Sequence, residues 1–159
     1  MNSSTINNAT WLITGGTGSL GQAFTKICLQ ECNPKSIRIY SRSEFQQLQM
    51  SNSIKDDRVR YFIGDVRDKN RLGRAMSDVG IVIHAAALKQ VPICEYNPVE
   101  AVQTNVIGSV NVVDCAIDNK VKKVILVSSD KACKPINLYG KTKAIAESIF
   151  IQGNVYARQ

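Results

Sequence analysis

The 159-residue sequence lacks residues that several common kinds of site require. His84 is its only histidine, so a metal centre would be short of ligands, and we expect no bound metal. The five cysteines are odd in number and follow a polar N-terminus, which indicates reduced thiols rather than a secreted disulfide framework. Cys28 and Cys32 stand four residues apart on an expected helix, and packing explains this pair better than metal binding.

Long apolar runs and aromatic clusters are also missing. No run approaches the ~20 residues that span a bilayer, and residues 1–10 do not resemble a signal peptide, so we expect a cytoplasmic protein without a membrane partner. The net charge is +7, but the one tight basic cluster, at Lys120, Lys122 and Lys123, contains no aromatic residues. We therefore expect no nucleic-acid partner, and anionic small ligands explain the charge equally well.

Apolar runs alternate with helical patterns along the chain. Strands are expected at 10–14, 36–41, 58–63, 80–84 and 123–128, and helices at 19–31, 44–50, 68–79, 97–119 and 137–156. This alternation predicts an α/β fold with a doubly wound parallel sheet, whose right-handed crossovers give the strand order 3-2-1-4-5. We expect one domain over residues 10–159, preceded by a polar tail over residues 1–9.

A glycine-rich loop joins the first strand to the first helix, in the sequence TGGTGSLG. Glycines here permit a tight turn, close approach of a pyrophosphate to the backbone, and close packing of the helix on the strand. A strand before the loop and a helix after it are the context that makes this pattern specific, so we expect a Rossmann-type domain that binds NADP or NAD. The predicted pyrophosphate contacts are Thr14, Gly15, Gly16, Thr17, Gly18, Ser19, Leu20 and Gly21.

The ends of the next strands suggest which dinucleotide is bound. Ser41 and Arg42 follow the second strand, where an NAD site usually carries an acid, and a guanidinium pairs well with a 2′-phosphate. We therefore favour NADP, while Glu44 keeps NAD open. Asp65 could accept from the adenine amino group with Val66 on the ring, although a helix-capping aspartate is an equal alternative.

The fourth strand ends in His84 and three alanines. The small side chains of Ala85, Ala86 and Ala87 leave room for the nicotinamide ribose. His84 either serves this site or is a hydrogen-bonded structural histidine.

Tyr139 and Lys143 form a Y-x-x-x-K pattern on the last expected helix. Residues four apart share a helix face, so the lysine would place its charge near the phenol and favour the phenolate. Tyr139 would then act as an acid or base near neutral pH.

In order along the chain, the motifs TGGTGSLG, GDVRD, HAAA, TNVIGSVN and YGKTK resemble the extended short-chain dehydrogenases/reductases. The segments YSRSEFQQ, HAAALKQVPICEYNPVEAVQTNVIGSVNV and SSDKACKPINLYGKTK narrow the resemblance to inverting UDP-N-acetylglucosamine 4,6-dehydratases of polysaccharide biosynthesis. It covers the chain from Trp11 to Phe150.

This resemblance implies a lyase reaction on UDP-N-acetylglucosamine or a related UDP-sugar. Tyr139, supported by Lys143, would take the 4-hydroxyl proton while hydride leaves C4 for the cofactor and later returns to C6. Lys131 would be the base at C5, Asp130 the acid for the leaving hydroxyl, and Ser129 a hydrogen-bond partner near C4. The resemblance also places Lys89 and the structural asparagine Asn105 at the cofactor site, and makes helices 97–119 and 137–156 the contact surface of a homo-oligomer.

Two departures from the family pattern are apparent. Ser129 stands where threonine is usual, and the sequence ends at Gln159, where family members continue into a part that grips the sugar nucleotide. We therefore expect a truncated or split enzyme. Another nucleotide-sugar epimerase or reductase, and an inactive NADP-binding remnant, are the alternatives.

Overall fold

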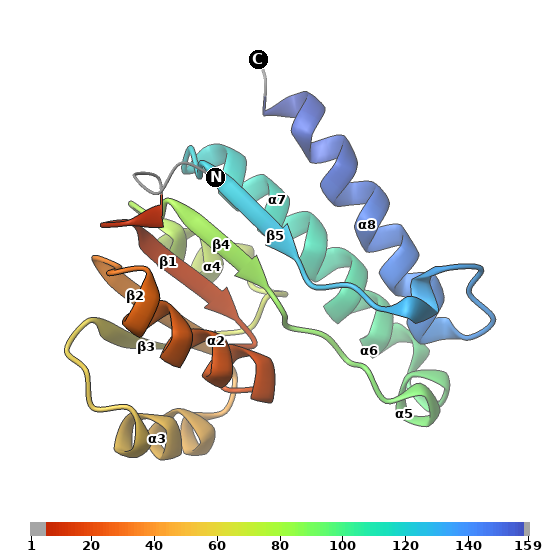
Figure 1. Cartoon of the computed structure of the whole chain (residues 1–159). Coiled ribbons are helices and arrows are strands. Elements are labelled where there is room, and N and C mark those ends of the chain that lie inside the picture. Colours follow the sequence, from red (N-terminus) through yellow and green to blue (C-terminus); the bar gives the residue numbers. More distant parts are fainter. Residues whose placement is uncertain (1–5, 158–159) are drawn as a thin grey trace.

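A five-stranded parallel sheet forms the centre of the computed structural model, which describes residues 6–157 (Figure 1). The strand order β3-β2-β1-β4-β5 confirms the predicted topology. The strands are β1 (Thr10–Thr14), β2 (Ser36–Ser41), β3 (Val59–Ile63), β4 (Ile81–His84) and β5 (Lys123–Leu126).

Helices cover both faces of the sheet. On one face lie α2 (Ser19–Glu31) and α3 (Glu44–Ser53); on the other lie α4 (Lys69–Met76), α7 (Gly108–Asp118) and α8 (Leu138–Tyr156). Strand alternation separates the two cores, because Leu12 and Tyr40 point to the α4–α7 side while Ile13 and Ile39 point to the α2–α3 side. In the parallel register Ile13 pairs with Ile39 on one side and Ile83 on the other. Every residue of β1 and β4 is buried, so these central strands are covered on both faces.

The expected helix over residues 97–119 is wrong in detail. The chain forms α5 (Val91–Tyr96), which was not predicted, then α6 (Pro98–Val102), a π-helical turn η1 (Gln103–Ile107) and α7. Prolines in the first turn of α5 and of α6 set these starts, because the ring fixes a helical φ and needs no amide partner there. A π-helical turn has no simple apolar periodicity, so the sequence pattern did not reveal η1.

Residues 6–9 of the predicted polar tail contact the rest of the fold. Ile6 and Ala9 pack against the α2–α3 core, and the Asn8 amide donates to the Asn33 carbonyl at 3.0 Å. Residues 1–5 of that tail, and residues 158–159 of the expected domain, lie outside the described part of the chain. Strand β5 ends at Leu126, two residues earlier than expected.

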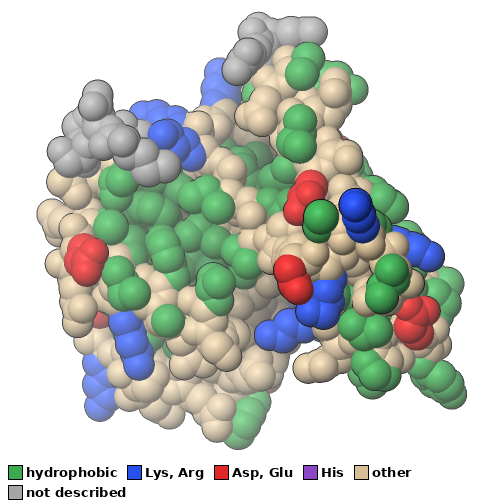
Figure 2. Space-filling view, turned by 45° about the vertical axis from the view of Figure 1, so that its right-hand side comes forward, with side chains coloured by type: hydrophobic (Ala, Val, Ile, Leu, Met, Phe, Trp, Pro, Cys, Tyr) green, Lys and Arg blue, Asp and Glu red, His purple; other side chains and the backbone are tan. Residues whose placement is uncertain are grey.

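Strand β5 is the edge of the sheet, since within residues 6–157 it pairs with β4 alone. Its Val124 packs against the α4–α7 core, whereas Ile125 on the opposite face is 41% exposed. Figure 2 shows hydrophobic side chains gathered on this side of the molecule. Within residues 6–157, no helix combines the length and the apolar character needed to cross a membrane.

Candidate active site

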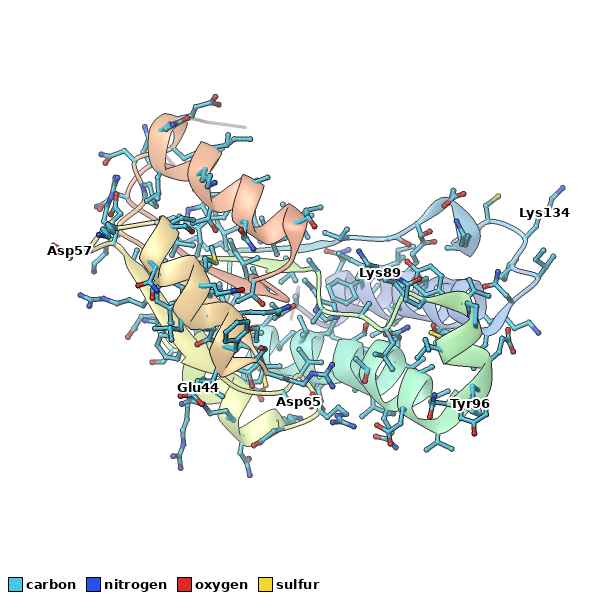
Figure 3. The ribbon with its side chains drawn as sticks, turned by 90° about the horizontal axis from the view of Figure 1, so that it is seen from below. Glu44, Asp57, Asp65, Lys89, Tyr96 and Lys134 are labelled. Carbon is cyan, nitrogen blue, oxygen red and sulfur yellow. The ribbon has the colours of Figure 1, made fainter. Side chains whose placement is uncertain are left out.

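A cavity of about 490 Å³ opens at the carboxyl ends of the strands. The strand order reverses between β1 and β4, and parallel sheets place ligand sites at this point because the connections on either side diverge. Figure 3 looks at the molecule from this end and shows Asp65 on the side of α3 and Lys89 on the side of α5. Fourteen predicted site residues line the cavity: Gly15, Thr17, Gly18, Leu20, Ser41, Arg42, Asp65, Val66, Ala85, Ala86, Ala87, Lys89, Tyr139 and Lys143.

The glycine-rich loop has the geometry expected of a phosphate-binding turn. Gly15 has φ +66°, and a Cβ there would come within 2.8 Å of the Ala86 nitrogen. At Gly21 a Cβ would collide with the main chain of Gly16, so α2 can approach the loop this closely only with glycine. The N-terminus of α2, which has Gly18 as its N-cap and no side-chain cap, therefore keeps amide groups free to face an anion.

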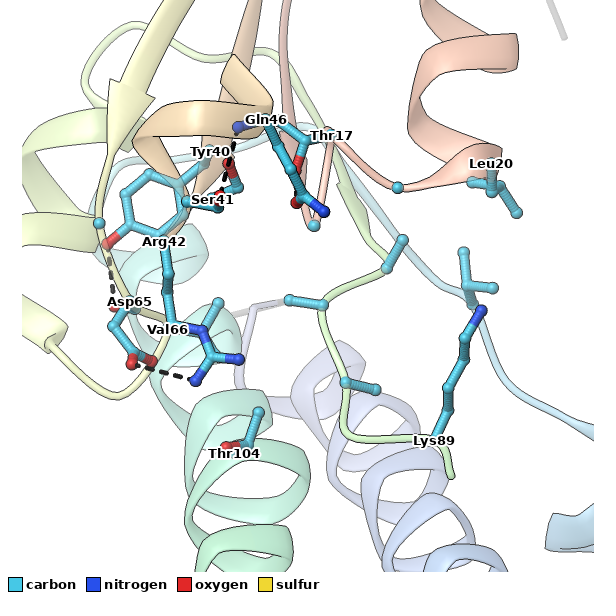
Figure 4. A pocket seen from close by; sticks show the side chains of 18 of the residues that line it. Thr17, Leu20, Tyr40, Ser41, Arg42, Gln46, Asp65, Val66, Lys89 and Thr104 are labelled. Atoms are coloured by element: carbon cyan, nitrogen blue, oxygen red, sulfur yellow. Dashed lines mark hydrogen bonds and ion pairs between the residues drawn. The ribbon is translucent and has the colours of Figure 1, made fainter. Parts of the chain in front are cut away.

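At the other end of the cavity, charged residues gather where β2 and β3 end (Figure 4). Arg67 holds the Asp65 carboxylate with its Nε at 2.9 Å and its Nη2 at 2.7 Å. Burial raises the pKa of Asp65, but the hydrogen bonds and charge of Arg67 outweigh it and the net shift is downward. Arg42 lies 3.9 Å from the same carboxylate with a half-exposed side chain, so its guanidinium remains available to an anion. Glu44 is exposed and does not line the cavity.

Several cavity residues escaped the sequence analysis: Tyr40, Ser43, Gln46, Gly64, Thr104, Val127 and Ser128. The Thr17 hydroxyl donates to the Gln46 side chain at 3.1 Å, which ties the glycine-rich loop to α3. Thr104, in the π-helical turn, and Ser128 each have a buried hydroxyl without a protein partner. Two adjacent serines follow β5, and the sequence did not show that Ser128 faces the cavity.

Tyr139 and Lys143 come together in the first turns of α8. Asn137 caps this helix, accepting from the Gly140 amide at 2.8 Å. Both side chains line the cavity although each is buried, and the Lys143 ammonium donates to the Val127 carbonyl at 2.6 Å. Burial lowers the pKa of Lys143, against an opposing effect of Glu147. The glycine-rich loop and the Tyr139–Lys143 pair thus share one cavity.

The family of polysaccharide biosynthesis proteins matches residues 11–159. The chain belongs to this family. It is 53% identical over 149 residues to a UDP-N-acetylglucosamine 4,6-dehydratase (inverting) of Campylobacter jejuni, covering 94% of this chain and 45% of the relative. It is 48% identical over 145 residues to a UDP-glucose 4-epimerase of Rickettsia bellii, covering 89% and 42%. The chain thus spans less than half the length of these relatives.

Solved structures show the same fold. Pen from Bacillus thuringiensis has a TM-score of 0.90 and 43% identity, covering 93% of this chain and 45% of that one. DesIV, a dTDP-glucose 4,6-dehydratase from Streptomyces venezuelae with NAD and TYD bound, has a TM-score of 0.81 and 24% identity, covering 88% and 50%. The second likeness supports the fold alone.

In this member of the polysaccharide biosynthesis family, three predicted catalytic residues lie outside the cavity. Ser129 accepts from the Lys131 amide and donates to Asp130 at 3.0 Å, and the Lys131 ammonium lies 3.4 Å from the same carboxylate. Ser129 and Lys131 lower the pKa of Asp130, which is fully exposed. Gly140 lets α8 pack on the Lys131 main chain, so the pair stays close to Tyr139 in the fold. As described, Asp130 and Lys131 form an exposed pair.

Most other predicted cofactor contacts are buried beneath the cavity wall. Thr14, Gly16, Gly21 and Asn105 are buried and do not line the cavity, whereas Ser19 is exposed outside it. The Asn105 side chain is fully engaged, accepting from the Leu88 amide at 2.8 Å and donating to the Leu88 carbonyl and to Thr142. Asn105 therefore holds the loop after β4 in place, rather than contacting a ligand directly.

The cysteines form no disulfide, and Cys28, Cys94 and Cys115 are buried, as packing residues are expected to be. Burial and the neighbouring Cys32 raise the pKa of Cys28 to about 12, so its thiol stays protonated. Within residues 6–157 no cluster of metal-ligating side chains is present.

Proposed function

We propose that this chain is the cofactor-binding part of an NADP-dependent, inverting UDP-N-acetylglucosamine 4,6-dehydratase. The observation that carries the proposal is the shared cavity, in which the glycine-rich loop lies opposite Tyr139 and Lys143. The identity to the Campylobacter jejuni dehydratase supports the substrate class, a UDP-sugar. The likeness to extended short-chain dehydrogenases supports a homo-oligomer through α6–α7 and α8, and the unpaired thiols support a cytoplasmic location.

NADP is the preferred cofactor in this proposal because of Arg42. Its guanidinium is half-exposed at the cavity end, its contact with Asp65 is long, and Arg42 follows β2 at the position where NAD sites usually carry an acid. NAD is the alternative, which Glu44 keeps open.

In the proposed reaction a dinucleotide held in this cavity would supply the hydride acceptor for C4 of the sugar and the hydride donor for C6. Tyr139 removes the 4-hydroxyl proton, with the buried Lys143 ammonium lining the same cavity. The resulting 4-ketone acidifies C5, from which Lys131 takes a proton while Asp130 protonates the leaving 6-hydroxyl. When hydride then adds to C6, the enolate takes up a proton at C5, which completes the 6-deoxy-4-keto sugar. Both residues must turn inward from the exposed pair for these steps.

A nucleotide-sugar 4-epimerase is the second candidate, and one observation favours it. Such a reaction needs the Tyr139–Lys143 pair but no base at C5, and Asp130 and Lys131 lie outside the cavity. The Rickettsia bellii relative carries the epimerase name.

Calorimetry of NADP and NAD binding tests the cofactor assignment. The wild-type chain should bind NADP more tightly than NAD. Arg42→Ala should weaken NADP binding by about tenfold or more, because one charge-assisted pair is lost, and should change the affinity for NAD little. Lys35→Ala, a remote surface change, is the matched control. Equal affinities for the two dinucleotides in the wild type would refute the role of Arg42.

An exchange assay tests the chemistry. Residues 1–159 would be completed with the C-terminal remainder of the Campylobacter jejuni relative and given UDP-N-acetylglucosamine in deuterated water. Tyr139→Phe should stop hydride removal, whereas Lys131→Ala should permit it and block exchange at C5. Normal C5 exchange in Lys131→Ala would exclude this lysine as the base, and C4 inversion without water loss would favour the epimerase.

A further inference from the structure

His84 is buried at the carboxyl end of β4, with 1% of its surface exposed, directly beneath the cavity wall. Its ring stacks on Phe150 of α8 with the centroids 5.7 Å apart. Both ring nitrogens have partners: Nδ1 lies 2.7 Å from the Thr14 hydroxyl, and Nε2 lies 3.4 Å from the Ser109 hydroxyl. The histidine therefore links the end of β1 to α7.

Thr14, His84 and Ser109 form a series of hydrogen bonds, and a main-chain group at each end of the series determines the direction in which every bond donates. The Ala86 amide can only donate, and it donates to the Thr14 hydroxyl oxygen at 3.3 Å. The Asn105 carbonyl can only accept, and it accepts from the Ser109 hydroxyl at 2.6 Å. Ser109 thus has no hydrogen left for His84, so Nε2 must carry the proton and Nδ1 must accept from Thr14. One neutral tautomer satisfies every bond.

The hydrogen-bond series ends at the main chain of Asn105, whose side chain binds Leu88. The loop after β4 is therefore held at two points. Ala86 is bonded to Thr14 at one end of the loop, and Leu88 is bonded through both its amide and its carbonyl to the Asn105 side chain at the other. Asn105 also donates to Thr142, whose hydroxyl donates to the Tyr139 carbonyl. The loop and the start of α8 are therefore joined through η1.

We propose that His84, as the neutral Nε2–H tautomer, is a positioning residue that holds residues 85–88 against the nicotinamide half of the bound dinucleotide. This inference rests on the proposed dinucleotide binding. Ala85, Ala86 and Ala87 line the same cavity as the glycine-rich loop and Tyr139. In the proposed binding mode the nicotinamide lies beside Tyr139, so a shift of residues 85–88 would change the contacts of this half first. Burial, with the charge of Lys143 adding to it, lowers the pKa of His84 to about 3, which keeps the ring neutral at ordinary pH.

Nitrogen NMR of the imidazole tests the tautomer in the wild-type chain. Because His84 is the only histidine, its two ring nitrogens need no assignment against others. At pH 7 we expect a pyrrole-type signal for Nε2 and a pyridine-type signal for Nδ1. A protonated Nδ1 would overturn the proposal, and this result requires neither a variant nor a bound ligand.

Binding measurements test the positioning role. His84→Phe keeps the ring stacking but removes both hydrogen bonds, and Ser109→Ala removes the bond that orients the ring. Each substitution should weaken binding of the dinucleotide by about two- to tenfold, the equivalent of one hydrogen bond. The affinity for ADP should stay within about twofold of the wild-type value. Val79→Ala, a buried change at the opposite end of β4, is the control for a loss of stability alone and should leave both ligands unchanged.

The outcomes separate the two proposals. Unchanged dinucleotide affinity in both variants, or equal weakening of ADP and the dinucleotide, would overturn the positioning role. A wild-type chain that binds neither dinucleotide refutes the proposed function instead. If His84→Phe does not fold, Ser109→Ala and the wild-type spectrum still decide the question.

Discussion

Acid should destabilise this fold through His84. In the unfolded chain the imidazole takes up a proton near its ordinary pKa of 6.5, whereas in the folded chain it stays neutral down to about 3. The unfolded state therefore binds more protons between these values, and stability that is complete above pH 6.5 is lost as the pH falls through this window. At pH 4.5, two units below the unfolded pKa, the loss should be about 2.7 kcal/mol.

Urea unfolding at pH 7.0 and pH 4.5 measures this difference. His84→Phe, which cannot titrate, should lose about 2–3 kcal/mol less than the wild type over the same interval. The carboxylates whose pKa is lowered in the fold do not produce this difference, because Asp56, held at about 2 by Arg58, destabilises the protein only as the pH falls below its ordinary value of 3.8. Parallel losses in the wild type and the variant would refute the reasoning.

Two further predictions concern the loop and the sheet edge. Gly21→Ala should reduce dinucleotide affinity at least tenfold, because its Cβ would meet the main chain of Gly16; Gly73→Ala, where the nearest atom is 3.7 Å away, should have no effect on calorimetric binding. Wild-type affinity in Gly21→Ala would show that the loop can relax without loss. Within residues 6–157 β5 has no neighbour on its outer side, so the 159-residue chain should self-associate in sedimentation experiments, and Ile125→Lys should reduce this association. A wild-type chain that stays monomeric at all concentrations, with β5 amides protected from hydrogen exchange, would contradict the prediction of self-association.

The positions of the strands could be predicted because each depends on local pattern. Short apolar runs bounded by turn residues predicted 10–14 and 36–41 to the residue, and the glycine-rich loop predicted the helix over 19–31 equally well. The topology followed from the handedness of crossovers. The helical spacing of Tyr139 and Lys143 placed both in the cavity, because residues four apart share a face wherever the helix lies.

The outer part of the candidate site depended on contacts between distant segments. Ser128 rather than Ser129 faces the cavity, because Ser129 is used to cap the turn at Asp130. Asn105 binds Leu88 instead of lining the cavity. The local sequence pattern did not predict the π-helical turn in which Asn105 lies.

The sequence by itself determined the parallel sheet, the glycine-rich loop and the Tyr139–Lys143 pair, since each rests on periodicity or on the special geometry of glycine. Only the tertiary structure decided the role of His84. Its choice of tautomer depends on the Ala86 amide and the Asn105 carbonyl, two main-chain groups that reach it through Thr14 and Ser109. These partners come from separate elements, and their directions are set by backbone chemistry that becomes visible only when the elements are packed together.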